Sequence, residues 1–167
     1  MKLLNHFFAL LVSAAILMSC GAAETGTTIK GTVQNAGNMK LRLEKVKLSS
    51  AAMTLAEVDT DNNGSFKTNF PEGLTEGLYR LTIGNQSAGL VLDGTEKTVE
   101  INGELSKLKQ QDFQVTGSQS TADLNNTMKD YYAKKFTAAD IISKSKSFDN
   151  PLVGMQFSLS TLGPRPE

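Results

Sequence analysis

Histidine and cysteine, two side chains much used in catalysis, are almost absent from this chain. Cys20 is its only cysteine and His6 is its only histidine. Nucleophilic catalysis of the Ser-His-Asp or Cys-His kind therefore lacks its parts beyond the first twenty residues, and so does a zinc site built from histidine and cysteine. A lone cysteine also cannot form a two-cysteine redox centre. We expect no catalysis by this chain on its own and no cofactor.

Cys20 still has the clearest chemistry of any residue, because of what precedes it. Lys2 and an apolar run over residues 7–18 are typical of a secretory signal peptide, and the run is too short to span a bilayer. The tetrapeptide Leu17-Met18-Ser19-Cys20 resembles a bacterial lipobox, in which a diacylglycerol is attached to the cysteine sulfur and the chain is cut just before it. An ordinary cleaved signal followed by a stray thiol is the alternative.

The lipobox resemblance implies how the N-terminus is organised. Residues 1–19 would be the signal peptide, and residues 20–26 a lipidated, flexible leader. A membrane would then be the first partner, reached through the lipid on Cys20, and the protein would lie in the cell envelope. The sequence Gly-Ala-Ala-Glu at residues 21–24 lacks an acidic cluster resembling a surface-export signal, which favours the periplasmic side of the inner or outer membrane.

Net charge argues against one class of partner. The chain has 17 basic and 17 acidic side chains, so its formal net charge is zero. No basic stripe interleaved with aromatic residues appears, and such a stripe is the usual mark of nucleic-acid binding. We expect no nucleic-acid partner, and nothing in the sequence sets the oligomeric state.

One acidic stretch has the spacing of a metal site. Asp59, Asp61 and Asn63 alternate ahead of Gly64, as in the first half of a calcium-binding loop. The twelfth position, which should be a bidentate glutamate, is Phe70. A hairpin turn uses the same residue types between two strands. We therefore expect no metal, with these three side chains as the only candidates.

Two adjacent aromatic residues are the candidates for ligand binding. Tyr131 and Tyr132 could stack on a sugar or a base. Their helical spacing from Leu124 and Met128 equally fits one ring packed in the core and the other half-exposed. The sequence leaves both interpretations open.

Eight short apolar segments are available to position these residues. They alternate in hydrophobicity at the spacing of a sandwich or barrel, with turn residues between them, Asn102-Gly103 among them. We predict a mainly β fold: an antiparallel β-sandwich or barrel-like domain of about eight strands over residues 27–117. The segments centre on residues 29–33, 39–43, 53–58, 66–70, 79–83, 88–92, 99–101 and 113–115.

One or two helices are expected after the strands, in a connector over residues 118–147. The stretches at 120–123 and 137–140 each begin with a hydroxyl side chain and end with aspartate, which is typical of a helix start. Asn150-Pro151 reads as a helix breaker. Residues 148–167 are then expected to be a tail with no packing partner in the β domain.

Four short stretches resemble a known family. In order, they are I-K-G-T-V at 29–33, D-T-D-N-N-G-S-F at 59–66, G-L-Y-R-L at 77–81 and F-Q-V-T-G-S at 113–118. Their order resembles the domain of unknown function 4369, a β domain found at the N-terminus of many lipoproteins. There it commonly precedes a thioredoxin-like domain of the TlpA and ResA type. The stretch F-D-N-P-L at 148–152 resembles the connector between those two domains.

The resemblance implies an accessory role. The chain would be the N-terminal domain of a thiol-disulfide oxidoreductase, acting as a tether, a spacer or a docking module for a redox domain or client protein. The thioredoxin-like domain with its Cys-x-x-Cys motif does not occur in this sequence, so the tail over 148–167 would be a truncated connector. Two alternatives remain: a stand-alone envelope lipoprotein that binds a glycan or peptide, and a purely structural envelope protein.

Overall fold

Eight strands form, each at one of the apolar segments. The computed structural model describes residues 26–47 and 50–162, so Cys20, its lipobox and most of the leader lie outside the described residues. In chain order the strands are β1 (Thr27–Gln34), β2 (Lys40–Lys45), β3 (Met53–Asp59), β4 (Ser65–Phe70), β5 (Gly77–Ile83), β6 (Gln86–Leu92), β7 (Thr98–Glu104) and β8 (Phe113–Thr116).

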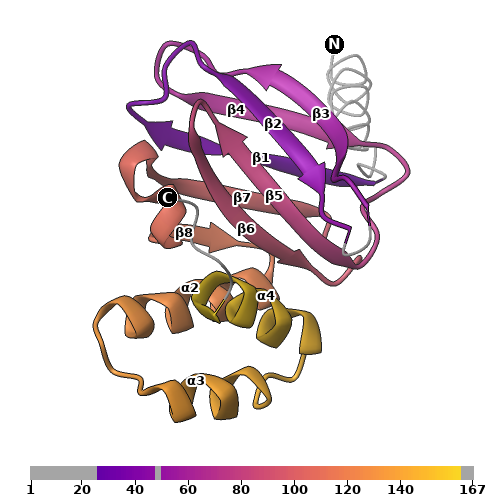
Figure 1. Cartoon of the computed structure of the whole chain (residues 1–167). Helices are drawn as coiled ribbons and strands as arrows, with labels where there is room; N and C mark the ends of the chain where they lie inside the picture. Colours follow the sequence, from indigo (N-terminus) through magenta and orange to yellow (C-terminus); the bar gives the residue numbers. More distant parts are fainter. Residues whose placement is uncertain (1–25, 48–49, 163–167) are drawn as a thin grey trace, which may run out of the picture.

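The strands build two four-stranded sheets that lie face to face (Figure 1). One sheet has the order β4-β1-β7-β8 and the other β3-β2-β5-β6. The second sheet is antiparallel throughout, but β1 and β7 run parallel, so the first sheet is mixed. The prediction of an all-antiparallel domain was therefore wrong for this pair. Hydrophobic alternation reports which face of a strand is buried and carries no information on its direction.

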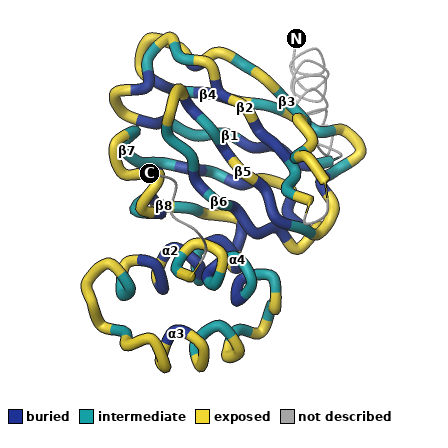
Figure 2. The backbone as a smooth tube through the Cα atoms, viewed as in Figure 1, coloured by how far each residue is buried: buried dark blue, intermediate teal, exposed yellow. Residues whose placement is uncertain are grey.

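The main core fills the space between the sheets. It takes the inward-facing residues of both, such as Ile29 and Ile101 from the mixed sheet and Leu41, Leu81 and Leu90 from the antiparallel one. All of these are at most 1% exposed. Figure 2 shows this burial as dark segments along the strands. The hydrophobic alternation therefore predicted correctly that each strand turns one face to this core.

Asn102-Gly103 was predicted to be a turn and instead lies inside β7. Asn102 accepts a hydrogen bond from the backbone N–H of Thr32 at 3.0 Å, which ties β7 to β1. A Cβ at Gly103 would lie 2.8 Å from the Cβ of Phe113 on β8. Glycine is required there because two strands approach closely, which is a different reason from a turn.

Four helical segments follow β7. They are the 3₁₀ helix η2 (Leu105–Gln110) before β8, and then α2 (Gln119–Tyr132), α3 (Ala138–Ser145) and α4 (Pro151–Leu162). Ser118 caps α2 by accepting from the N–H of Thr121, two residues earlier than predicted. Thr137 and Asp140 form the predicted capping box at α3.

The helix α4 was not predicted, because Asn150-Pro151 was interpreted as a breaker. Here the dipeptide begins a helix instead. Asn150 accepts a hydrogen bond from the N–H of Leu152 at 2.8 Å, as a capping residue does. Pro151 occupies the first helical position, where its missing N–H costs nothing. There are thus three α-helices after the strands, where one or two were expected.

The helices form a layer against one edge of the sandwich, with α2 and α4 next to β6 and α3 outermost (Figure 1). A second apolar cluster joins them to the outer face of the antiparallel sheet. It contains Leu78 and Val91 from the sheet with Leu124, Val153 and Phe157 from the helices. The segment expected to be an unpartnered tail is therefore packed, and Phe157 is fully buried. No helix in the described ranges is long and apolar enough to cross a bilayer.

A candidate binding groove beside strand β6

A groove of about 750 Å³ opens where the helical layer meets the outer face of the antiparallel sheet. This volume lies within the range of small-ligand sites in proteins. We call it the β6 groove. Its lining residues come from both sheet strands and helices: Val46, Tyr79, Arg80, Ser87, Ala88, Gly89, Lys109, Gln111, Met128, Tyr131, Tyr132, Lys134, Phe136, Gln156, Leu159 and Ser160.

Gly89 lies at a narrow point of the groove. A Cβ there would be 2.9 Å from Nε2 of Gln156 and 3.3 Å from Nε2 of Gln111. The side-chain amide of Gln111 makes the two hydrogen bonds to Gly89 that the backbone of a neighbouring strand would make. Its Oε1 accepts from the Gly89 N–H at 3.1 Å, and its Nε2 donates to the Gly89 carbonyl at 2.8 Å. Gln111 thus closes one step of the β6 edge, which no strand covers.

The start of α2 closes the next step of the same edge. The Thr121 hydroxyl accepts from the Val91 N–H at 3.0 Å and donates to the Val91 carbonyl at 2.8 Å. Ser118 donates to the same carbonyl at 2.9 Å. Side chains therefore replace a missing strand at Gly89 and at Val91. An edge closed in this way cannot pair with another chain along these positions.

Replacing Thr121 by valine should lower the free energy of unfolding by about 1–3 kcal/mol. The two residues have the same shape, but valine leaves the buried N–H and C=O of Val91 without the Thr121 hydroxyl. Urea denaturation followed by circular dichroism measures the change. Thr121→Ser, which keeps a hydroxyl, should lose much less, and equal losses in both variants would show that the methyl group matters instead.

Both candidate tyrosines lie in this groove. Their rings meet edge to face, with centroids 5.4 Å apart, and Tyr131 also packs on Phe157. Tyr131 is half-buried, while Tyr132 is 50% exposed. The structure thus shows the second arrangement offered by the sequence, with one ring in the helical core and its neighbour half-exposed at the groove. Stacking on a sugar or a base stays a prediction.

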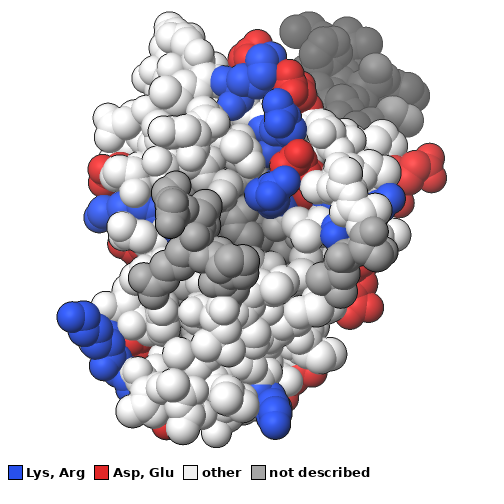
Figure 3. All heavy atoms as spheres, in the orientation of Figure 1, with Lys and Arg blue, Asp and Glu red and all other residues white. Residues whose placement is uncertain are grey.

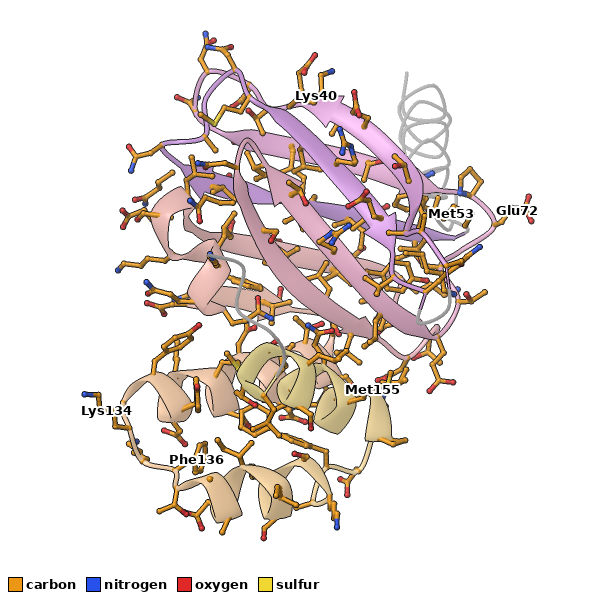
Figure 4. All side chains as sticks on the ribbon, viewed as in Figure 1. Lys40, Met53, Glu72, Lys134, Phe136 and Met155 are labelled. Carbon is orange, nitrogen blue, oxygen red and sulfur yellow. The ribbon has the colours of Figure 1, made fainter. Side chains whose placement is uncertain are left out.

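Among the described residues, the charges on the groove wall are all positive. Arg80, Lys109 and Lys134 line it, and no described acidic side chain does. Glu44 accepts from Nε of Arg80 at 2.9 Å on the sheet surface. Lys134 lies at the outer end of the helical layer, in the turn after α2, whereas Phe136 points inward among the helices (Figure 4).

Away from the groove, the antiparallel sheet carries a band of paired charges, visible as adjoining blue and red atoms in Figure 3. Glu57 accepts from Lys40 and from Arg42, each at 3.2 Å. These hydrogen bonds hold the pKa of Glu57 below its ordinary value, and the bond to Glu57 raises the pKa of Lys40. Pairs as exposed as these satisfy one another and contribute little to stability.

The three metal candidates do not converge. Asp59 lies in β3 and pairs with Lys40 at 3.5 Å. Asp61 accepts from the N–H groups of Asn63 and Ser65, each at 2.8 Å, and so stabilises the hairpin turn between β3 and β4. Within the residues that the structure describes, no group of three or more His, Cys, Asp or Glu side chains lies close enough together to hold a metal ion.

Several groove residues had no signal in the sequence. Gln111 is an ordinary polar residue far in the chain from Gln156 and Leu159, which both lie on α4, and the packing of α4 brings all three to the groove. Gln111 also adopts a left-handed conformation with φ of 58°, which aims the end of η2 back at β6. The role of Gln111 could have been predicted only with the knowledge that β6 is an edge strand whose outer backbone groups need partners.

No family model and no curated protein match the sequence. Among solved structures, a crystal structure of (S)-allantoin synthase is similar over 56% of this chain and 44% of that chain. The sequence identity is 13% and the TM-score 0.42. This chain thus spans less than half of that protein. The comparisons assign it to no family, and the β6 groove is the feature from which a function can be inferred.

Proposed function

We propose that this chain is a lipid-anchored protein on the periplasmic side of the cell envelope, and that its β domain is an accessory domain of a thiol-disulfide oxidoreductase. In this role the domain tethers a redox domain or client protein to the membrane, holds it at a distance from the bilayer, or provides a surface to which it docks. The redox chemistry belongs to that domain or client protein. Confinement to a membrane raises the effective concentration of two partners without any new contact. One acyl chain holds weakly, so permanent anchoring needs the two or three chains of a mature lipoprotein.

The observation that carries the docking role is the β6 groove. It is open to a partner and is walled by aromatic and cationic side chains. The pKa shifts of the described carboxylates arise instead from exposed surface pairs and a helix cap, as at Glu57, Glu100 and Asp140. No described carboxylate lines the groove, so an anionic partner would meet no like charge there.

The anchor is tested by labelling cells with a fatty acid that carries an alkyne group. We expect the label on the wild-type chain and on Ser19→Ala, which keeps a small residue at the cut, and none on Cys20→Ser. Mass spectrometry should find a diacylglyceryl group on Cys20. The purified chain should also show no turnover in an insulin-reduction assay. A free thiol at Cys20 in protein from its native envelope, or turnover, would contradict the proposal.

A stand-alone lipoprotein that binds a glycan is the second candidate, favoured by one observation. Tyr132 is 50% exposed and lines the groove, where its ring could stack on a sugar. An oligosaccharide screen separates the two candidates. Glycan binding that is lost in Tyr132→Ala and kept in Tyr132→Phe would favour this candidate over the oxidoreductase accessory role.

A further inference from the structure

We propose that the β6 groove binds an extended acidic peptide segment of a partner protein, which adds to the edge of β6 at Ser87. This inference rests on the proposed docking function and names the chemistry of the partner. Three properties of the groove carry it: its charge, its open backbone and its apolar wall.

The positive charge of the groove favours an anionic ligand. Among the described residues its wall contains three cations and no acidic side chain, although the chain as a whole has a formal net charge of zero. Glu44 holds Arg80 from the sheet side. Lys109 and Lys134 are exposed, and neither has an acidic partner among the described residues. A ligand with several carboxylates would complete these pairs.

The backbone of β6 favours a peptide over another anion. Gly89 and Val91 direct their N–H and C=O groups away from β5, where Gln111 and Thr121 bind them. Ser87 is the preceding residue in this alternation and also lines the groove. Its backbone groups have no hydrogen-bond partner within the described ranges. An added strand would supply both partners for Ser87, which a glycan would do only by chance.

The remaining wall suits the apolar side chains of such a segment. Tyr132 and Leu159 line the groove and are 50% and 49% exposed. Successive side chains of an extended peptide point to opposite sides. A segment that alternates glutamate with an apolar residue can therefore place one set near the lysines and the other against this wall.

The test measures binding of a fluorescein-labelled, seven-residue peptide of alternating glutamate and phenylalanine to the full-length chain in mild detergent. Fluorescence anisotropy should show saturable binding that weakens as salt rises from about 0.05 to 0.3 M, because salt screens exposed charges. The same peptide with lysine in place of glutamate should not bind. N-methylation of the peptide amides that face β6 should abolish binding, because it removes the N–H that pairs with the Ser87 carbonyl.

Matched variants locate the site. Lys109→Glu and Lys134→Glu should each weaken binding about threefold to tenfold, as expected for an exposed charge. Lys97→Glu carries the same charge change in the loop before β7 and should bind like the wild type. Gly89→Val should weaken binding at least about tenfold, since its side chain enters the groove. The atoms that it meets first are the ends of two flexible glutamines, so it should still fold.

The outcomes separate this inference from the function on which it rests. Equal affinity for the lysine peptide, or unchanged affinity in both Lys109→Glu and Lys134→Glu, overturns the acidic-peptide site. Binding of oligogalacturonate, an anionic glycan, without binding of the peptide also overturns it. In each of these cases the lipid on Cys20 and the absence of insulin reduction remain as independent tests of the tethering role.

Discussion

Replacing Phe157 by alanine is expected to lower the free energy of unfolding by about 3–5 kcal/mol, the cost of emptying a buried phenylalanine site. Phe157 is fully buried at the centre of the helical layer. Its ring contacts three others edge to face, with centroids 6.1 Å from Phe136, 6.2 Å from Phe148 and 6.3 Å from Tyr131. Among the residues that the structure describes, no other single side chain joins the rings of α2, the α2–α3 connection and the α3–α4 connection.

The loss can be measured by urea denaturation followed by circular dichroism. Near-ultraviolet bands of the tyrosines report largely on the helical layer, because the chain has no tryptophan and two of its three tyrosines, Tyr131 and Tyr132, lie in α2. Leu159→Ala is the matched control, since Leu159 lies on the same helix but is 49% exposed, and it should cost less than about 1 kcal/mol. If both variants lose the same small amount, α4 is not packed as the structure has it.

Gly117→Ala is the second substitution with a large expected effect, a loss of about 2–5 kcal/mol. Gly117 joins β8 to α2 with φ of 81°, which costs an L-residue about 1–2 kcal/mol. In addition, its Cβ would lie 1.9 Å from the backbone oxygen of Thr98, at the start of β7. That oxygen belongs to a strand of the sheet and cannot move aside as a flexible side chain would, so overpacking adds about 1–3 kcal/mol.

Gly73→Ala separates the two causes. Gly73 has nearly the same φ, 78°, but the nearest atom to its Cβ would be the Thr27 hydroxyl oxygen at 3.8 Å, an ordinary contact. It should therefore cost only the conformational strain. A thermal or urea melt of both variants gives the comparison, and similar losses would show that the sheet relaxes around Gly117.

The positions of the strands could be predicted from the sequence because each strand has one face in the core. Ile29, Leu41, Leu81 and Ile101 illustrate this, since each is completely or almost completely buried. The parallel pairing of β1 with β7 could not be predicted in the same way. It depends on the path of the chain through the second sheet, and no local pattern records that path.

The helical layer was predicted less well, for a physical reason. Proline disfavours helix in the residue before it and favours helix when it occupies the first position, so Asn150-Pro151 is consistent with either an end or a start. The burial of Phe157 among other aromatic rings stabilises the helix that starts here. These are tertiary contacts, which the local sequence does not show. The groove follows from the same packing, so Tyr131 and Tyr132 were candidates but Gln111 and Gln156 were not.

The side-chain seal on β6 also bears on how this chain folds as it is made. Residues 86–92 emerge from the ribosome before Gln111, Ser118 and Thr121, so the strand exists for a time with its amides uncovered. Unpaired edges of this kind are where nascent chains aggregate. The segments after β8 thus protect the edge of β6 only once they have been synthesised. A chain that ends before residue 118 should therefore be the form most prone to form fibrils.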